Sequence, residues 1–164
     1  MILIDTSVYI SALTDKELED KIKEVAKKAV IMSSLVVEKE IGKSSDFLRK
    51  IGKKEDAERL KTLHDISAGG KIGLTPFVLK LAEEYSIAVR NNFGKRKARY
   101  MIEDFRIVAA SSAAALEAIA TFNRKTMANE DIIKIYRKVN EKYTLKTPRF
   151  IKTKSGLIEF LSSL

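Results

Sequence analysis

The chain has 164 residues, no cysteine, a single histidine and a formal net charge of +9. A chain of this length can bury one full hydrophobic core, so we expect one globular domain. The lack of cysteine excludes disulfides, thiolate catalysis and zinc sites with Cys ligands. His64 lies in a stretch with helical spacing, where we interpret it as an ordinary helix residue rather than the base of a serine-type triad. Hydrolytic chemistry would therefore have to rest on carboxylates and a metal ion.

The apolar segments are too short to cross a membrane, which takes ~18 uninterrupted apolar residues. The opening run, Met1 to Ile4, also lacks the basic lead of a signal peptide. We therefore expect a cytoplasmic protein with no membrane partner. Abundant Lys and Glu without any Gln or Trp is a composition typical of thermophilic proteins.

Short apolar runs alternate with helical patterns along the chain. Ile2 to Ile4 is a continuous apolar run, as expected for a buried parallel strand, and Asp5-Thr6-Ser7 offers capping side chains for a helix after it. Glycines at 69, 70 and 73 predict a turn within a segment that is otherwise helical from Ser44 to Arg90. Further strands are expected near 30–32, 118–121 and 148–151, and further helices near 8–13, 18–29, 102–117, 130–142 and 156–161. This alternation predicts a three-layer α/β/α fold with a central parallel sheet of about four to five strands.

Basic residues are clustered rather than evenly spread. One cluster has no acidic residue among its five cations, Arg90, Lys95, Arg96, Lys97 and Arg99. A second stretch, from Arg137 to Lys154, contains seven basic residues and Glu141 as its only acid. Because clustered cations suit the phosphates of a nucleic acid, we expect nucleic-acid-binding surfaces here, and the first cluster is our predicted binding site.

Acidic and amide side chains follow the strands at the edge where α/β folds bind their ligands. Asp5 comes directly after the first strand, and Asn123 follows the strand that ends at Thr121. Asp104 begins a helix whose far end leads into that same strand, so its carboxylate can return to this edge. A fourth acid follows the second strand. Residues two apart point about 200° apart on a helix, so only one of Glu38 and Glu40 can face the site, and the apolar seam beside Glu40 favours Glu40.

Several carboxylates that are drawn together cannot all stay ionised without a cation. Hard divalent ions with oxygen ligands, Mg²⁺ or Mn²⁺, suit such a set. An acidic metal cluster beside a basic surface is what phosphodiester cleavage needs. Each acid taken alone could instead be a solvated residue or a helix cap, and Asp5 in particular could be only an N-cap.

The motifs as a set resemble those of the PIN-domain family, including VapC-type toxins and archaeal PIN ribonucleases. The similarity lies in the opening strand with its first acid, a Glu followed by an aliphatic residue, an acid before an Ile-Val-Ala helix, a Thr two residues before Asp or Asn, and a Pro-containing C-terminal segment: Ile2–Ser7, Ser34–Ile41, Glu103–Ala110, Ala120–Met127 and Thr147–Phe150. The chain is thus expected to be a single PIN-like domain over residues 1–164 with a helical insertion at about 44–92.

The resemblance implies an endoribonuclease that cleaves single-stranded RNA with Mg²⁺ or Mn²⁺ through a metal-activated water. Asp5, Glu40 and Asp104 would hold the metal, Asn123 would assist them directly or through water, and the supporting hydroxyls would come from Thr6, Ser7 and Thr121. Asn123 departs from members with a fourth Asp, and an amide adds no charge, so a second metal would bind more weakly. The alternatives are a PIN-fold RNA-binding or RNA-processing scaffold with weak catalysis and a toxin held by an antitoxin. An antitoxin, a processing complex and a homodimer are the protein partners that the resemblance leaves open.

Overall fold

The computed structural model describes residues 1–164 and is built on a five-stranded parallel sheet. The strands run in the spatial order β3-β2-β1-β4-β5, and they are β1 (Ile2–Ile4), β2 (Ile31–Ser34), β3 (Ala68–Ile72), β4 (Ala118–Ala120) and β5 (Arg149–Ile151). β1 is the central strand, and its three residues are fully buried. The chain first builds the sheet outward from β1 on one side and then returns to the other side, so the switch in strand order falls between β1 and β4.

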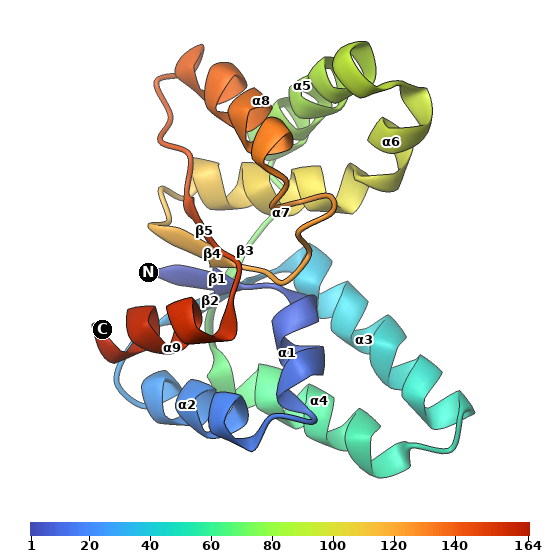
Figure 1. Cartoon of the computed structure of the whole chain (residues 1–164), viewed down its shortest axis with the longest axis vertical. Helices are drawn as coiled ribbons and strands as arrows, with labels where there is room; N and C mark the ends of the chain where they lie inside the picture. The colour runs from blue at the N-terminus through green and yellow to red at the C-terminus, as the bar shows by residue number, and fades with distance from the viewer.

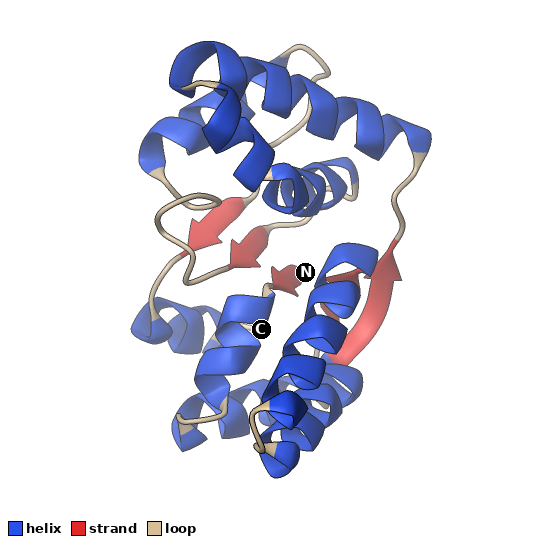
Figure 2. Cartoon of the chain, turned by 90° about the vertical axis from the view of Figure 1, so that its right-hand side faces the viewer, coloured by secondary structure: helices blue, strands red, loops and turns tan.

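Nine helices cover the two faces of this sheet and give the predicted three-layer α/β/α fold. They are α1 (Thr6–Ala12), α2 (Lys16–Ala26), α3 (Leu35–Lys50), α4 (Lys54–Ser67), α5 (Pro76–Phe93), α6 (Lys95–Tyr100), α7 (Ile102–Ala113), α8 (Glu130–Glu141) and α9 (Lys154–Ser162). Figure 1 shows α5 to α8 above the sheet and α1 to α4 with α9 below it, and Figure 2 shows the strands between the two helical layers from the side. We refer to these two groups of helices as the upper and lower layers. No helix is long and apolar enough to span a membrane.

Most of the predicted strands and helices form where local chemistry favours them. Asp5, Asp15, Ser34 and Thr75 each accept a hydrogen bond from a backbone N–H in the first turn of the helix that follows, which satisfies a donor that the helix itself leaves free. Pro76 occupies the first position of α5, where the missing N–H costs nothing. The predicted parallel sheet with helices on both sides is confirmed.

Three elements differ from the sequence prediction: no helix was predicted at α6, and the other two are β3 and α7. The segment with Gly69 and Gly70, expected to be a turn, is the edge strand β3 and pairs with β2. A Cβ at Gly70 would lie 2.8 Å from the Met32 sulfur, so glycine leaves room for the Met32 side chain over β3. α7 ends at Ala113 rather than Glu117, because the chain turns through Ala115 at φ +52° before β4 begins.

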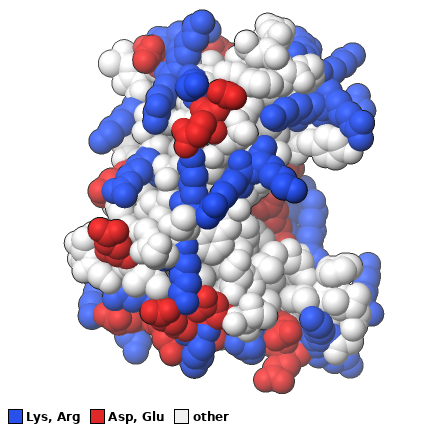
Figure 3. Space-filling view, in the orientation of Figure 1, with Lys and Arg blue, Asp and Glu red and all other residues white.

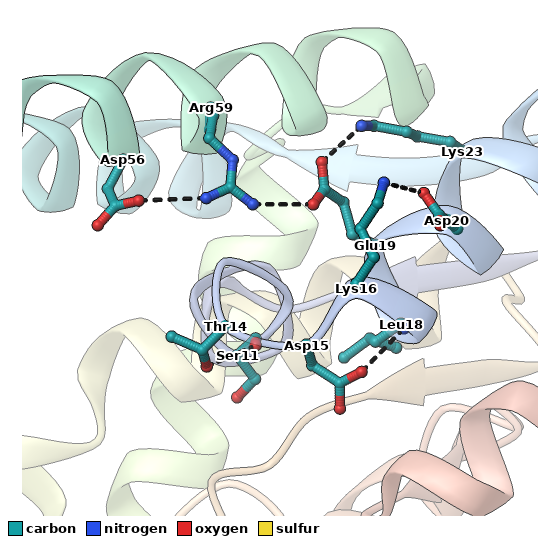
Figure 4. A network of polar contacts seen from close by, with 10 residues as sticks. All are labelled: Ser11, Thr14, Asp15, Lys16, Leu18, Glu19, Asp20, Lys23, Asp56 and Arg59. Atoms are coloured by element: carbon teal, nitrogen blue, oxygen red, sulfur yellow. Dashed lines mark hydrogen bonds and ion pairs between the residues drawn. The ribbon is translucent and has the colours of Figure 1, made fainter.

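A charged network also holds the lower layer together. Figure 4 shows that Glu19 on α2 lies between Lys23 of its own helix and Arg59 of α4. The carboxylate accepts hydrogen bonds from Lys23 at 2.5 Å and from Arg59 at 2.9 Å. These bonds compensate for the burial of a Glu that is only 7% exposed, and they tie α2 to α4 far from any predicted site residue.

Candidate functional site

Asp5 lies where β1 ends and α1 begins, at the switch in strand order. Its Oδ2 accepts hydrogen bonds from the hydroxyls of Ser7, at 2.6 Å, and Thr121, at 2.8 Å, and also caps α1 through the backbone N–H of Ser7. Thr121 follows β4, so this contact joins residues that are far apart in the sequence but adjacent in the sheet. The other oxygen, Oδ1, has no protein partner. Asp5 is therefore an N-cap and also a 5% exposed carboxylate with one oxygen left for a ligand.

Glu40 and Glu38 point to different surroundings, as the spacing on a helix requires. Glu40 accepts a hydrogen bond from the Thr6 hydroxyl at 2.8 Å through Oε2, which brings it beside Asp5. Glu38 forms an ion pair with Lys71 of β3 at 2.7 Å. Burial raises the pKa of Glu40, the hydrogen bond from Thr6 opposes that rise, and the negative charge of Asp5 adds to it.

Asp104 lies in the first turn of α7 and completes a group of three acids. The Thr126 hydroxyl donates to its Oδ2 at 2.5 Å, while its Oδ1 has no protein partner. Burial raises the pKa of Asp104 to about 7; the Thr126 hydrogen bond lowers it, and the charges of Asp5 and Glu40 raise it further. Asp104 is thus partly protonated at neutral pH unless a cation compensates its charge.

Asn123 stands beside these acids on the loop after β4. Its backbone N–H donates to the Thr121 hydroxyl at 3.1 Å, and its side-chain oxygen accepts from the backbone N–H of Thr126 at 3.3 Å. The amide thereby fixes the loop that carries both Thr121 and Thr126, the hydroxyl partners of Asp5 and Asp104.

All four predicted site residues line one open pocket of about 370 Å³. Its lining is almost entirely polar: Asp5, Thr6, Ser7, Ile10, Glu40, Lys43, Ser44, Asp104 and Asn123. Figure 3 shows acidic side chains recessed in the notch on the right-hand side of the molecule, with Lys and Arg on either side of the notch. Sequence reasoning missed Lys43 and Thr126. The spacing of Lys43, three residues after Glu40 on a helix, is the signal that could have found it.

The donor set suits a hard divalent cation. Asp5, Glu40 and Asp104 each use one oxygen to accept from a hydroxyl and keep the other without a protein partner. No three acids gather closely enough to hold an ion by themselves. Mg²⁺ is commonly bound through one or two carboxylates with water and substrate phosphate as its other ligands, so this looser arrangement fits Mg²⁺ or Mn²⁺.

The predicted basic site forms the end of α5 and the short helix α6. Gly94, at φ +90°, ends α5 and lets the chain turn into α6, which leads directly into α7 and Asp104. Arg96 lies over the ring of Tyr100 and Lys97 over the ring of Phe93, at 5.9 and 4.8 Å from the ring centres. Tyr100 is 74% exposed, so this surface offers cations and an aromatic face together.

His64 is buried and bound on both sides of its ring. Nε2 lies 2.9 Å from the Ser33 hydroxyl, and Nδ1 lies 3.1 Å from Asp65. Ser33 is fully buried and does not line the acidic pocket, so its hydroxyl is not placed to attack a substrate there. This arrangement fixes α4 against β2.

The sheet, its strand order and the position of the pocket together define a PIN-like α/β/α fold. In comparison with known proteins, no family model and no curated protein matches the sequence. Among solved structures, the fold is similar to one in the crystal structure of VapBC2 from Rickettsia felis, in which VapBC2 is bound to a DNA fragment from its own promoter. The likeness has a TM-score of 0.59 at 15% sequence identity and covers 92% of this chain and 98% of that chain.

Proposed function

We propose that this protein is a Mg²⁺- or Mn²⁺-dependent endoribonuclease that cleaves single-stranded RNA. The observation that carries the proposal is the pocket in which Asp5, Glu40 and Asp104 each present one oxygen with no protein partner. Burial and the charges of Asp5 and Glu40 raise the pKa of Asp104, and a bound cation would compensate the negative charge of the three acids. The PIN-like fold and the motifs that resemble the PIN family support the same conclusion.

The three acids would hold the cation while their hydroxyl partners keep them in place. The Thr6 hydroxyl holds one oxygen of Glu40, and the hydroxyls of Ser7 and Thr121 hold one oxygen of Asp5. The second oxygen of each carboxylate would thereby be oriented before a cation binds. A divalent ion in such a site supplies the positive charge that neutralises a scissile phosphate and makes water a stronger nucleophile at neutral pH. Asn123 would add a neutral oxygen at the edge of the site.

The substrate would be held by phosphate contacts outside the pocket. The five cations from Arg90 to Arg99 lie on α5 and α6, next to the helix that carries Asp104. Their lack of acidic neighbours in sequence and the exposed ring of Tyr100 favour a single strand, in which both phosphates and base faces are accessible.

Substitution of Asp5 by Asn tests the proposal. We expect D5N to lower the cleavage of single-stranded RNA in Mn²⁺ by about a hundredfold or more, because the cation loses a charged ligand. E40Q should have a similar effect. E38Q is the matched control and should cleave like the wild type, since Glu38 pairs with Lys71 outside the pocket. A wild type that cleaves nothing, or a D5N variant that is as active as the wild type, would rule out the proposed activity.

Two finer readings of the same site are distinguished by the same variants. Asn123 places an amide where some PIN-domain family members have a fourth acid, which favours an RNA-binding or RNA-processing scaffold with weak catalysis. In that case wild-type cleavage would be barely measurable, and D5N would bind RNA as well as the wild type does. The likeness to VapBC2 instead supports a toxin restrained by an antitoxin. Expression of the wild type alone would then arrest cell growth, and expression of D5N would not.

A further inference from the structure

The face of α3 that carries Glu40 continues beyond the acidic pocket. An α-helix has 3.6 residues per turn and rises 1.5 Å per residue. Phe47, seven residues after Glu40, therefore points within about 20° of the same direction and lies ~10 Å further along the helix axis. Lys43 lies one turn before Phe47 and Lys50 one turn after it. Both lysines are rotated about 40° to 60° from Phe47 around the helix axis, in the same direction. The pocket thus opens onto a surface on which cation, aromatic ring and cation follow one another.

The side chains of this surface are available for a ligand. Phe47 is 61% exposed, more than any other phenylalanine of the chain. Lys43 lines the pocket, and neither Lys43 nor Lys50 has a carboxylate partner. Arg49, on the opposite side of α3, is in contrast engaged by Asp46 and Glu58. The exposed ring of Phe47 thus lies between two cations that have no ion-pair partner, an arrangement that could serve a ligand.

We propose that Lys43, Phe47 and Lys50 form a track for the RNA strand where it leaves the pocket. Proteins bind single strands by pairing cations with the phosphates and stacking bases on aromatic rings, and the order of residues on α3 provides both in alternation. Lys43 binds the phosphate next to the scissile one, Phe47 stacks on a neighbouring base, and Lys50 binds a phosphate beyond it. This proposal rests on the proposed function, because it takes the pocket as the place of cleavage.

Continuity with the pocket and charge complementarity select RNA as the occupant of this surface. Ile51 extends the apolar line by one turn and is 52% exposed, so an apolar protein surface is the competing occupant. The two differ in what they require of residue 47. A base needs the flat face of an aromatic ring, whereas an apolar protein contact is served equally well by leucine.

Binding measured without a divalent ion separates the track from catalysis. The probe is a fluorescein-labelled RNA single strand about 12 nucleotides long, and its affinity is followed by anisotropy in EDTA. We expect F47L to weaken binding about tenfold and F47W to bind like the wild type. I66A, which shortens another exposed apolar side chain on α4, is the control and should leave RNA binding unchanged. An F47L protein that binds as tightly as the wild type would overturn the proposal, and a change of oligomeric state with unchanged RNA binding would assign Phe47 to a second copy of the chain.

A double-mutant cycle then tests the stacking contact itself. Abasic sites are placed one at a time along the probe, and the loss caused by F47L is measured for each probe. At one abasic position the loss should vanish, because the base that stacks on Phe47 is already missing. Equal losses at every position would contradict a stacking contact. If RNA binding depends on Phe47 but the wild type cleaves no RNA, the RNA track is supported and the nuclease activity is rejected. The two proposals can therefore fail separately.

Discussion

Burial and the neighbouring acids raise the pKa of Asp104 to about 7, which makes stability depend on pH at this residue. An unfolded Asp titrates near 3.9, so between about pH 4 and pH 7 the folded protein binds more protons at this residue than the unfolded chain does. The contribution of Asp104 to the free energy of unfolding therefore falls as the pH rises through this window and stays low above it. A divalent ion that binds the ionised carboxylate should recover that loss.

This dependence gives a prediction for D104N. Without divalent ions, the variant should be more stable than the wild type at about pH 8, where the wild type carries a buried charge, and the difference should shrink towards about pH 4. Thermal unfolding at both pH values measures this, with D46N as a control at an exposed acid. Mg²⁺ should raise the Tm of the wild type at the higher pH and leave that of D104N almost unchanged. A D104N protein that is less stable than the wild type at about pH 8 would contradict the assigned pKa shift.

Individual site residues were predictable to different degrees. Asp5 and Asp104 could be placed from the sequence because each adjoins an apolar element whose end is obvious. The choice of Glu40 over Glu38 rested on one apolar seam and on the resemblance to the PIN-domain motif. The structure gives each glutamate a different neighbour, Thr6 for Glu40 and Lys71 for Glu38. Lys43 was missed because its spacing from Glu40 points to a site residue only once Glu40 is known to line the pocket.

At the scale of the element, α3 connects fold stability to the site. Its first turn is capped by the fully buried Ser34, whose hydroxyl accepts from the backbone N–H of Val37 at 3.2 Å. We expect S34A to lower the free energy of unfolding by about 1 kcal/mol, because a backbone donor loses its partner. T75A removes the same kind of cap from α5 and should cost a similar amount. Only S34A should also weaken Mn²⁺ binding, measured by calorimetry, since α3 carries Glu40. Equal Mn²⁺ affinities of the two variants would show that the Ser34 cap does not influence the metal site.

The elements that the sequence did not predict are those without an apolar pattern. β3 contains two glycines and lies at the edge of the sheet, so it lacks the buried β-branched run by which central strands are found. Four of the six residues of α6 are basic, and its one buried residue, Ala98, gives no helical period. Both elements are defined by tertiary contacts, β3 by pairing with β2 and α6 by its place between α5 and α7.

At the scale of the whole molecule, a net charge of +9 should make RNA binding depend strongly on salt. Removing two cations of α6 in the double variant K95Q/R99Q should lower the slope of log affinity against log salt by about 1.4, at about 0.7 for each lost single-strand phosphate contact. K27Q/K61Q removes the same charge from the lower layer, where neither lysine has an ion-pair partner, and should leave the slope nearly unchanged. Anisotropy titrations in increasing NaCl measure both, and equal slopes for the two variants would remove α6 from the RNA-binding surface.

The hydroxyl contacts that fix the acids connect distant parts of the chain, and this governs when the site can exist. Asp5 is synthesised 116 residues before its partner Thr121, which directly follows the strand β4 that pairs with β1. A chain still being synthesised can carry all three acids and yet lack the strand and the loop that hold two of them in place. During translation the pocket can therefore be assembled only after the segment with Thr121 and Thr126 has left the ribosome.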